Sequence, residues 1–314
     1  MSVKSIDVGM ASGVPLRKKK PFRLYLRVLL PSLLVLVFTS SVFIGVLSYR
    51  IIHSYSSQEE SNPASYLLPY QDLSFAAADG SHSLWFIPGS KGSPAVFLCH
   101  DYGANRVSLL NLAALLRESG YNVFLIAFRG HGRSGYARST LGLKEGDDLA
   151  YGINFAVKNL AVHETAVGVW GVALGAHAAI RAALKDNRIR VLVLDSPYSS
   201  VFDFLSHQVA ERVGFESEIL SSIIGGVYSL YLWTSPGAIL EAVDVRPLFP
   251  VRQMYVAGLD TPAFARWTRR LYAQAEGRKD ILILPRSRKS TLLTSELKSY
   301  DSRVLDYFQK HLPR

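Results

Sequence analysis

The sequence has a single cysteine, Cys99, and no pattern of residues suited to holding a metal ion. One cysteine cannot form a disulfide within the chain, so cysteine pairing says nothing about the redox compartment. The eight histidines are scattered, with no His-x-x-x-His motif and no carboxylate cluster at ligand spacing. We therefore expect no metal site, no metal catalysis and no cofactor.

Signatures of nucleic-acid binding are also missing, although the formal net charge is +10. The chain has no helix-turn-helix, zinc-finger or RNA-binding motif, so no nucleic-acid partner is expected. Much of the basic excess lies before residue 28, where the sequence has seven Lys and Arg residues and one acidic residue, Asp7. With 49% hydrophobic and 19% charged residues, most of the chain should fold around a buried core.

Charged residues are absent from residues 28–49, VLLPSLLVLVFTSSVFIGVLSY. At about 1.5 Å per residue, a helix of this length crosses the roughly 30 Å hydrocarbon core of a bilayer. The sequence thus predicts a single-pass membrane anchor. The positive-inside rule leaves the basic tail, residues 1–27, in the cytoplasm and puts the rest on the translocated side, periplasmic or extracytoplasmic. A cleaved signal peptide is the alternative, but the run is long for one and lacks a small-x-small cleavage site.

The chain after the anchor alternates between short apolar runs and segments with helical periodicity. Residues 50–70 are polar at first and contain Pro63 and Pro69, which predicts a linker into a domain at 71–314. An antiparallel hairpin turning at Asp79-Gly80 opens this domain. Further strands are expected at 95–99, 122–128, 166–170, 191–195, 251–258 and 281–285, and helices near 107–118, 145–158, 174–185, 262–275 and 297–311. This order predicts an α/β fold with a mostly parallel sheet, helices on both faces and a helical cap insertion at about 200–247.

Six ordered motifs carry a resemblance to a known family. They read LCHDYGANR, AFRGHGRSG, LGLKEGDDLAYGINFAVKN, GVALG, DSPYSS and the pair AGLDTP with LPRSRKS. Over residues 64–314 the chain resembles the α/β-hydrolase superfamily, in its serine-hydrolase branch with HGxG, RGHGxS and nucleophile-elbow motifs. The resemblance implies a nucleophile on a strained strand-to-helix turn, a histidine base and a carboxylate that orients the histidine.

Two of the three catalytic positions implied by this resemblance carry the wrong residue. Ala173 occupies the nucleophile position and has no hydroxyl, while Lys289 occupies the histidine position. A lysine with an ordinary pKa of about 10.4 is protonated at neutral pH and cannot accept a serine proton. Asp260 fits the acid position but would lack a histidine to orient, and a capping role before Thr261-Pro262 is an equal alternative. We expect a catalytically degenerate member without hydrolytic activity.

The oxyanion loop departs from the family pattern as well. The resemblance places the loop and its pocket at His100, Asp101, Tyr102 and Leu174, with Asp101 where the family has glycine. A carboxylate here would oppose a developing negative oxygen unless its side chain turned away. In the next motif, Arg129 and His131 are interpreted as members of a structural loop network.

The expected role is therefore binding, at the former active-site cleft, of a lipid-like or peptide ligand or of a protein partner. The uncharged segment 219–233 is interpreted as a lid, a bilayer-contacting face or a core helix. The alternative function is an active serine hydrolase, esterase or acyl transferase with a displaced nucleophile. Ser134 and Ser196 follow strands at the same sheet edge, but no adjacent base is identified for either.

Overall fold

A computed structural model describes residues 22–53, 59–78, 80–132, 134, 138–160, 162–163, 166–287 and 292–312. These residues belong to two units, one ending at Val46 and one comprising Leu47–Arg314. Helix α1, Phe22–Ile52, supplies the described part of the first unit and the first residues of the second. Lys289 and the turn residue Asp79 lie outside the described residues.

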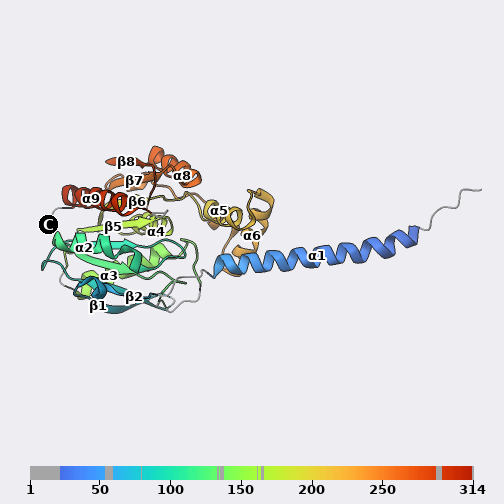
Figure 1. Ribbon diagram of the computed structural model, residues 1–314, viewed down its shortest axis with the longest axis horizontal. Helices are drawn as coiled ribbons and strands as arrows, with labels where there is room; N and C mark the ends of the chain where they lie inside the picture. The colour runs from blue at the N-terminus through green and yellow to red at the C-terminus, as the bar shows by residue number, and fades with distance from the viewer. Residues whose placement is uncertain are drawn as a thin grey trace, which may run out of the picture. The chain divides into compact units, whose positions relative to one another are not determined.

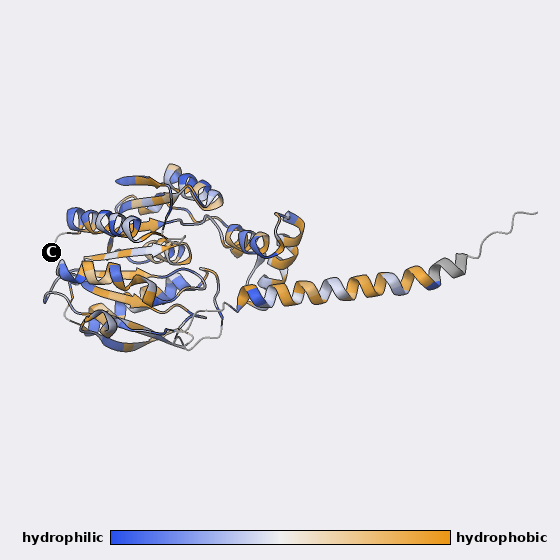
Figure 2. Cartoon of the chain, viewed as in Figure 1, coloured by the Kyte–Doolittle hydropathy of each residue, from blue (hydrophilic) through white to orange (hydrophobic). Residues whose placement is uncertain are grey.

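Helix α1 is long and apolar enough over Arg27–Ile52 to cross a membrane, and a signal sequence shares these features. Within the first unit its hydroxyl groups turn back onto the helix, where Ser32 and Ser41 donate to carbonyl oxygens four residues earlier, both at 2.8 Å. These two hydroxyl groups are thereby satisfied inside the helix, as an apolar surrounding requires. Figure 2 shows the apolar character along the helix.

The end of α1 differs from the prediction of a linker starting at residue 50. The helix continues to Ile52, and the side chains of Leu47, Ser48, Ile51 and Ile52 are buried in the second unit. The apolar Ile51-Ile52 pair explains the difference, because these side chains pack into the domain and extend the helix past Arg50. The remaining described part of the predicted linker contains one short 3-10 helix, η1, Pro63–Tyr66.

The second unit is built on one sheet of eight strands in the order β1-β2-β4-β3-β5-β6-β7-β8 (Figure 1). The strands are β1 Gln71–Ala77, β2 Gly80–Ile87, β3 Ala95–Cys99, β4 Asn122–Ile126, β5 Val167–Val172, β6 Ile189–Asp195, β7 Arg252–Gly258 and β8 Lys279–Leu284. β2 pairs antiparallel with β1 and β4, and β3 to β8 pair in parallel. The central strands β3, β4 and β5 are buried along their whole length, which their continuous apolar sequences predict.

Helices cover both faces of this sheet. Helix α2, Leu110–Glu118, packs against α9, Thr294–His311, on one face, and α3, Glu145–Asn159, packs against α4, Leu174–Ala183, on the other. Helix α8, Pro262–Gln274, lies against β7, and the 3-10 helix η2, Arg106–Leu109, precedes α2. The predicted fold class, an α/β-hydrolase fold, is confirmed.

The segment between β6 and β7 contains no strand and forms the cap. It holds α5 Val201–Val213, α6 Glu218–Tyr231, α7 Pro236–Leu240 and the 3-10 helix η3 Arg246–Leu248. A capping box starts α5, where Ser200 Oγ accepts from Asp203 N at 3.1 Å. In Figure 2 α6 is coloured mostly as apolar, whereas α5 beside it carries more polar residues.

Candidate active site

Ala173 lies on the sharp turn between β5 and α4, and its backbone is strained. Its φ of 44° and ψ of −100° belong to a region that residues with a side chain rarely adopt. A β-carbon at Gly175 would lie 2.2 Å from the carbonyl oxygen of Cys99, so only glycine lets α4 approach β3 this closely. At Gly171 it would lie 2.4 Å from the Gly175 carbonyl carbon. The turn has the geometry of a nucleophile elbow, with a methyl group where the nucleophile would stand.

The carboxylate of Asp101 lies between two backbone N–H groups. Its Oδ1 accepts a hydrogen bond from Tyr102 N at 2.7 Å and from Leu174 N at 3.3 Å. A nucleophile elbow builds its oxyanion hole from the N–H after the nucleophile and an N–H of the loop after the third strand, which here are Leu174 and Tyr102. The side chain therefore does not turn away from these two N–H groups, and its Oδ1 accepts hydrogen bonds from both.

Tyr102 connects the same loop to the end of α1. Its hydroxyl donates to the backbone carbonyl oxygen of Ile51, a close contact between groups 51 residues apart in the chain. Its ring packs edge-to-face against Phe204 of the cap and against His131. The loop residue that supplies one N–H to Asp101 is thus fixed by α1, by the cap and by the neighbouring loop.

His100 and His131 are both held as neutral structural side chains. His100 Nδ1 lies 2.7 Å from the carbonyl oxygen of Asp101, while its Nε2 accepts from Phe128 N at 3.2 Å. His131 has the same arrangement, with Nδ1 at 2.9 Å from Arg129 O and Nε2 accepting from Gly103 N at 2.9 Å. Burial lowers the pKa of His100 to about 3 and also lowers the pKa of His131. Both nitrogens of each ring contact backbone groups, so neither histidine is free to act as a catalytic base.

Arg129 likewise makes a buried structural contact. Its Nε donates to Asp148 Oδ2 at 2.7 Å, and Asp148 Oδ1 also lies 3.1 Å from His82 Nε2. These contacts fix the loop after β4 to the first turns of α3.

Asp260, at the predicted acid position, lies beside the loop that follows β8. The backbone N of Asp260 donates to Pro285 O at 3.2 Å. A β-carbon at Gly258 would lie 2.6 Å from Asp260 Oδ1 and 2.7 Å from Ser287 N, so Asp260 and Ser287 approach one another across this glycine. The sheet thus brings Asp260 to the loop whose sequence continues to Lys289.

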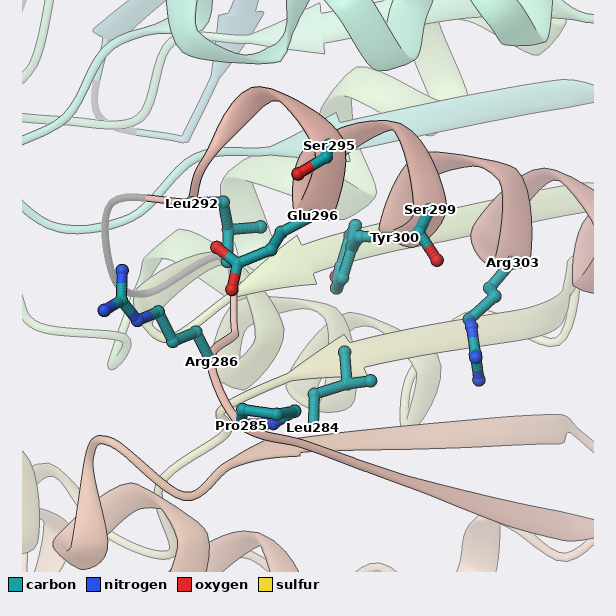
Figure 3. Close-up of a pocket in the computed structure, with 9 residues that line it drawn as sticks. All are labelled: Leu284, Pro285, Arg286, Leu292, Ser295, Glu296, Ser299, Tyr300 and Arg303. Carbon is teal, nitrogen blue, oxygen red and sulfur yellow. The ribbon is translucent and has the colours of Figure 1, made fainter.

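A cavity of about 310 Å³ opens between this loop and the start of α9 (Figure 3). Arg286 and Arg303 stand on opposite sides of it, with Glu296 between them. Glu296 also accepts a hydrogen bond from Leu293 N at 2.9 Å and so caps α9. The lining includes neither the elbow nor the Asp101 loop, so this cavity is separate from both.

The comparisons with known proteins agree with this geometry. A family model described as serine aminopeptidase, S33, matches residues 91–213, from β3 through the elbow to the end of α5. The esterase Pf2001 of Pyrococcus furiosus superposes with a TM-score of 0.59 at 20% identity, over 82% of this chain and 98% of its own. The chain thus has the α/β-hydrolase fold, and over residues 91–213 its sequence is similar to the serine aminopeptidase, S33, family.

The curated relatives match only part of this chain, and the chain spans only part of their length. An uncharacterized 31.7 kDa protein of Escherichia coli is 30% identical over 107 residues, which are 33% of this chain and 37% of that protein. The uncharacterized protein YqkD of Bacillus subtilis is 24% identical over 220 residues, 68% of this chain and 70% of its own. These matches are partial similarities and carry no activity to this chain.

Ser196 is the candidate for a displaced nucleophile whose surroundings the structure describes most fully. It is fully buried at the carboxyl end of β6, with a φ of 51°. Among the described residues its Oγ contacts Asp195 Oδ1 at 2.7 Å and Ser287 Oγ at 2.9 Å, and neither partner is an imidazole. Sequence reasoning named Ser196 but missed Ser287, whose participation depends on how the loop after β8 folds back.

The other candidate groups have structural surroundings. Cys99 is fully buried, and burial raises the pKa of its thiol. Ser134 donates its backbone N–H to His131 O at 3.2 Å. Within the described ranges, no three His, Cys, Asp or Glu side chains are grouped as metal ligands.

Proposed function

We propose that this α/β-hydrolase-fold protein is anchored in a membrane by α1, does not hydrolyse substrates, and acts by binding a ligand or protein partner beside its former catalytic centre. The observation that carries the proposal is the position of Asp101. Its Oδ1 accepts from the two N–H groups that would stabilise a substrate oxyanion, and the neighbouring elbow residue is Ala173. An anionic transition state would have to displace a carboxylate that is part of the protein.

A binding role is supported by buried polar atoms around Tyr198. His177 Nε2, Ser199 Oγ and Tyr228 OH are buried and have no hydrogen-bond partner within the part of the chain that the structure describes. His177 stacks on Tyr198, with ring centroids 4.4 Å apart. Burial raises the pKa of Tyr228, and Glu145 and the phenols of Tyr198 and Tyr102 add to this effect. Buried groups of this kind normally have partners, so a bound polar molecule would complete them.

Membrane anchoring is supported by the length and apolar composition of Arg27–Ile52. The seven basic residues before Val28 favour a cytoplasmic tail and a domain on the translocated side. The test is labelling of intact cells with a membrane-impermeant maleimide. Leu259→Cys should be labelled, because this side chain is 51% exposed, and Ser5→Cys in the tail should not. Labelling of Ser5→Cys alone would show that the orientation is the opposite of the one proposed.

The alternative, an active hydrolase with a displaced nucleophile, rests on the strained Ser196 and its contact with Asp195. The esterase name of a structural neighbour makes it worth testing. The full chain in detergent micelles is incubated with a fluorophosphonate, and its intact mass is measured. No adduct is expected on the wild type, whereas an adduct that disappears in Ser196→Ala would establish the alternative.

Native mass spectrometry of the detergent-extracted chain tests the binding role itself. A co-purified molecule or protein that remains bound to wild type and is lost from Tyr228→Phe is the expected result. An unloaded chain at every expression level would remove the support that the buried polar atoms give.

A further inference from the structure

Helix α6 is apolar on two opposite faces, and one of them is uncovered. Its inner face is buried through Ser221, Ile224 and Tyr228. On the outer face Ile219, Ile223 and Leu230 are 77%, 44% and 73% exposed, and Trp233 just beyond the helix is 91% exposed. The first three share a face because residues four and seven apart recur on one side of a helix. These four side chains are called the α6 surface below.

The sequence around the α6 surface lacks the charged side chains that favour exposure to water. Between Glu218 and Glu241 no residue carries a charge, and the helices at both ends of this stretch lie in the cap. Water-exposed helices usually carry charged side chains on their outer face. An uncovered apolar surface of this kind indicates contact with a membrane or with another protein.

The contact between the end of α1 and α6 favours the membrane. His53, which follows α1, lies 3.5 Å through Nε2 from the hydroxyl of Tyr231, the last residue of α6. Tyr49 stacks on His53, with ring centroids 4.1 Å apart. The C-terminal end of α6 therefore adjoins the point where α1 enters the domain.

No spacer separates the apolar part of α1 from the domain. Residues Arg27–Val46 form a helical stretch of about 30 Å at 1.5 Å per residue, enough for a bilayer core, and the buried residues begin at Leu47. In the proposed anchor, a span of this length would end at the water–lipid boundary, close to the residues that lie beside Tyr231. Tyrosine and tryptophan are the residues enriched at that depth.

We propose that the α6 surface inserts into the lipid leaflet at which α1 leaves the membrane, so that the cap is a second, monotopic attachment of the domain. The proposal rests on the membrane anchoring proposed above. Insertion would carry Ile219, Ile223, Leu230 and Trp233 about 5–10 Å into the boundary between headgroups and acyl chains. The cap would then open toward lipid rather than toward water.

Depth-dependent quenching tests this in the full chain reconstituted in phosphatidylcholine–phosphatidylglycerol vesicles. An environment-sensitive fluorophore is attached to Ile223→Cys or Leu230→Cys, and the native Cys99 is buried and gives no background. Ile283→Cys on β8 is the matched control, since Ile283 is 47% exposed and Ile223 is 44% exposed. Val37→Cys, within the apolar stretch of α1, reports on the anchor.

The expected result is loss of emission at positions 223 and 230 with lipids spin-labelled near the headgroup, less loss with lipids labelled deep in the chain, and no loss at 283. Position 37 should be quenched most by the deep label. Quenching at 37 without quenching at 223 and 230 would overturn the α6 proposal and leave the anchor intact. A blue-shifted emission at 223 and 230 without lipid quenching would mean that protein, such as a second copy of the chain, covers the surface, and would also overturn it. No quenching at 37 would overturn the anchor and this proposal together.

Discussion

Asp101 Oδ1 lies 3.3 Å from the backbone nitrogen of Leu174, the first residue of α4. The same oxygen lies 2.7 Å from Tyr102 N, so one carboxylate joins the loop after β3 to the elbow after β5. A negative charge at the start of a helix is also favoured by the helix dipole. Asp101, which the proposed function gives the role of blocking catalysis, is thus expected to stabilise the fold, and this expectation can be measured.

Asp101→Ala should destabilise the domain by about 1–3 kcal/mol, because the buried N–H of Leu174 and the part-buried N–H of Tyr102 lose their acceptor. Asp101→Asn keeps an acceptor oxygen in nearly the same place and should cost less than Asp101→Ala. Chemical denaturation of the full chain in micelles gives both free energies of unfolding. Equal stability of wild type and both variants would show that the two hydrogen bonds contribute nothing.

Ala173→Gly should stabilise the protein by about 1 kcal/mol. The φ of 44° and ψ of −100° strain a residue with a β-carbon by about 1–3 kcal/mol, and glycine removes this strain at an entropic cost of about 0.5–1 kcal/mol. Ala178→Gly is the control, because Ala178 is also fully buried but lies inside α4, where the same change should destabilise. Thermal unfolding of the two variants in micelles should move in opposite directions; parallel shifts would argue against strain at the elbow.

Tyr102→Phe should loosen the end of α1 by removing the donor to the Ile51 carbonyl oxygen, at a cost of about 1 kcal/mol. Amide hydrogen exchange should become faster at residues 47–53. Tyr121→Phe is the matched control, since Tyr121 donates 2.9 Å to the carbonyl oxygen of Leu312 at the other end of the chain. Unchanged exchange at 47–53 in Tyr102→Phe would mean that the burial of Leu47 and Ile51 alone holds this segment.

The domain should lose stability as the pH falls below 6.5. Burial lowers the pKa of His100 and of His177 to about 3, so between pH 6.5 and 3 the unfolded chain binds protons that the folded chain does not. Stability is therefore complete above the unfolded pKa, and each histidine costs about 1.4 kcal/mol per pH unit below it. His177→Asn, which keeps a donor toward the Tyr198 carbonyl oxygen at the position of Nδ1, should reduce the slope by one proton. An unaltered slope would assign the acid sensitivity to other groups.

Much of the fold was predictable because its signals are local. The apolar runs, the Gly171-Gly175 spacing and the order of motifs predict the strands, the sharp turn after β5 and the fold class without tertiary information. Element ends were less accurate: the expected strand 122–128 ends at Ile126, and the expected strand 191–195 begins at Ile189. At both strands the sheet register, rather than the apolar run, sets the boundary.

The candidate site was predictable in its residue types but not in its geometry. The sequence places Asp101 next to the oxyanion position, yet only the fold brings Leu174 N within reach of its carboxylate. In the same way, Arg50 and the polar residues after it indicate a linker, whereas the burial of Ile51 and Ile52 and the contact of the Ile51 carbonyl oxygen with the distant Tyr102 appear only in the tertiary structure. The Lys289 position remains a prediction from the sequence.

The most direct test of a non-catalytic centre is stepwise repair, followed by ester hydrolysis in micelles. Wild type and Ala173→Ser should be inactive, and Ala173→Ser with Lys289→His should be weak because Asp101 still occupies the hole. Adding Asp101→Gly should raise the rate on the order of 10²–10³-fold, the usual contribution of an oxyanion-hole donor. Hydrolysis by the wild type, or full activity from Ala173→Ser alone, would contradict the account.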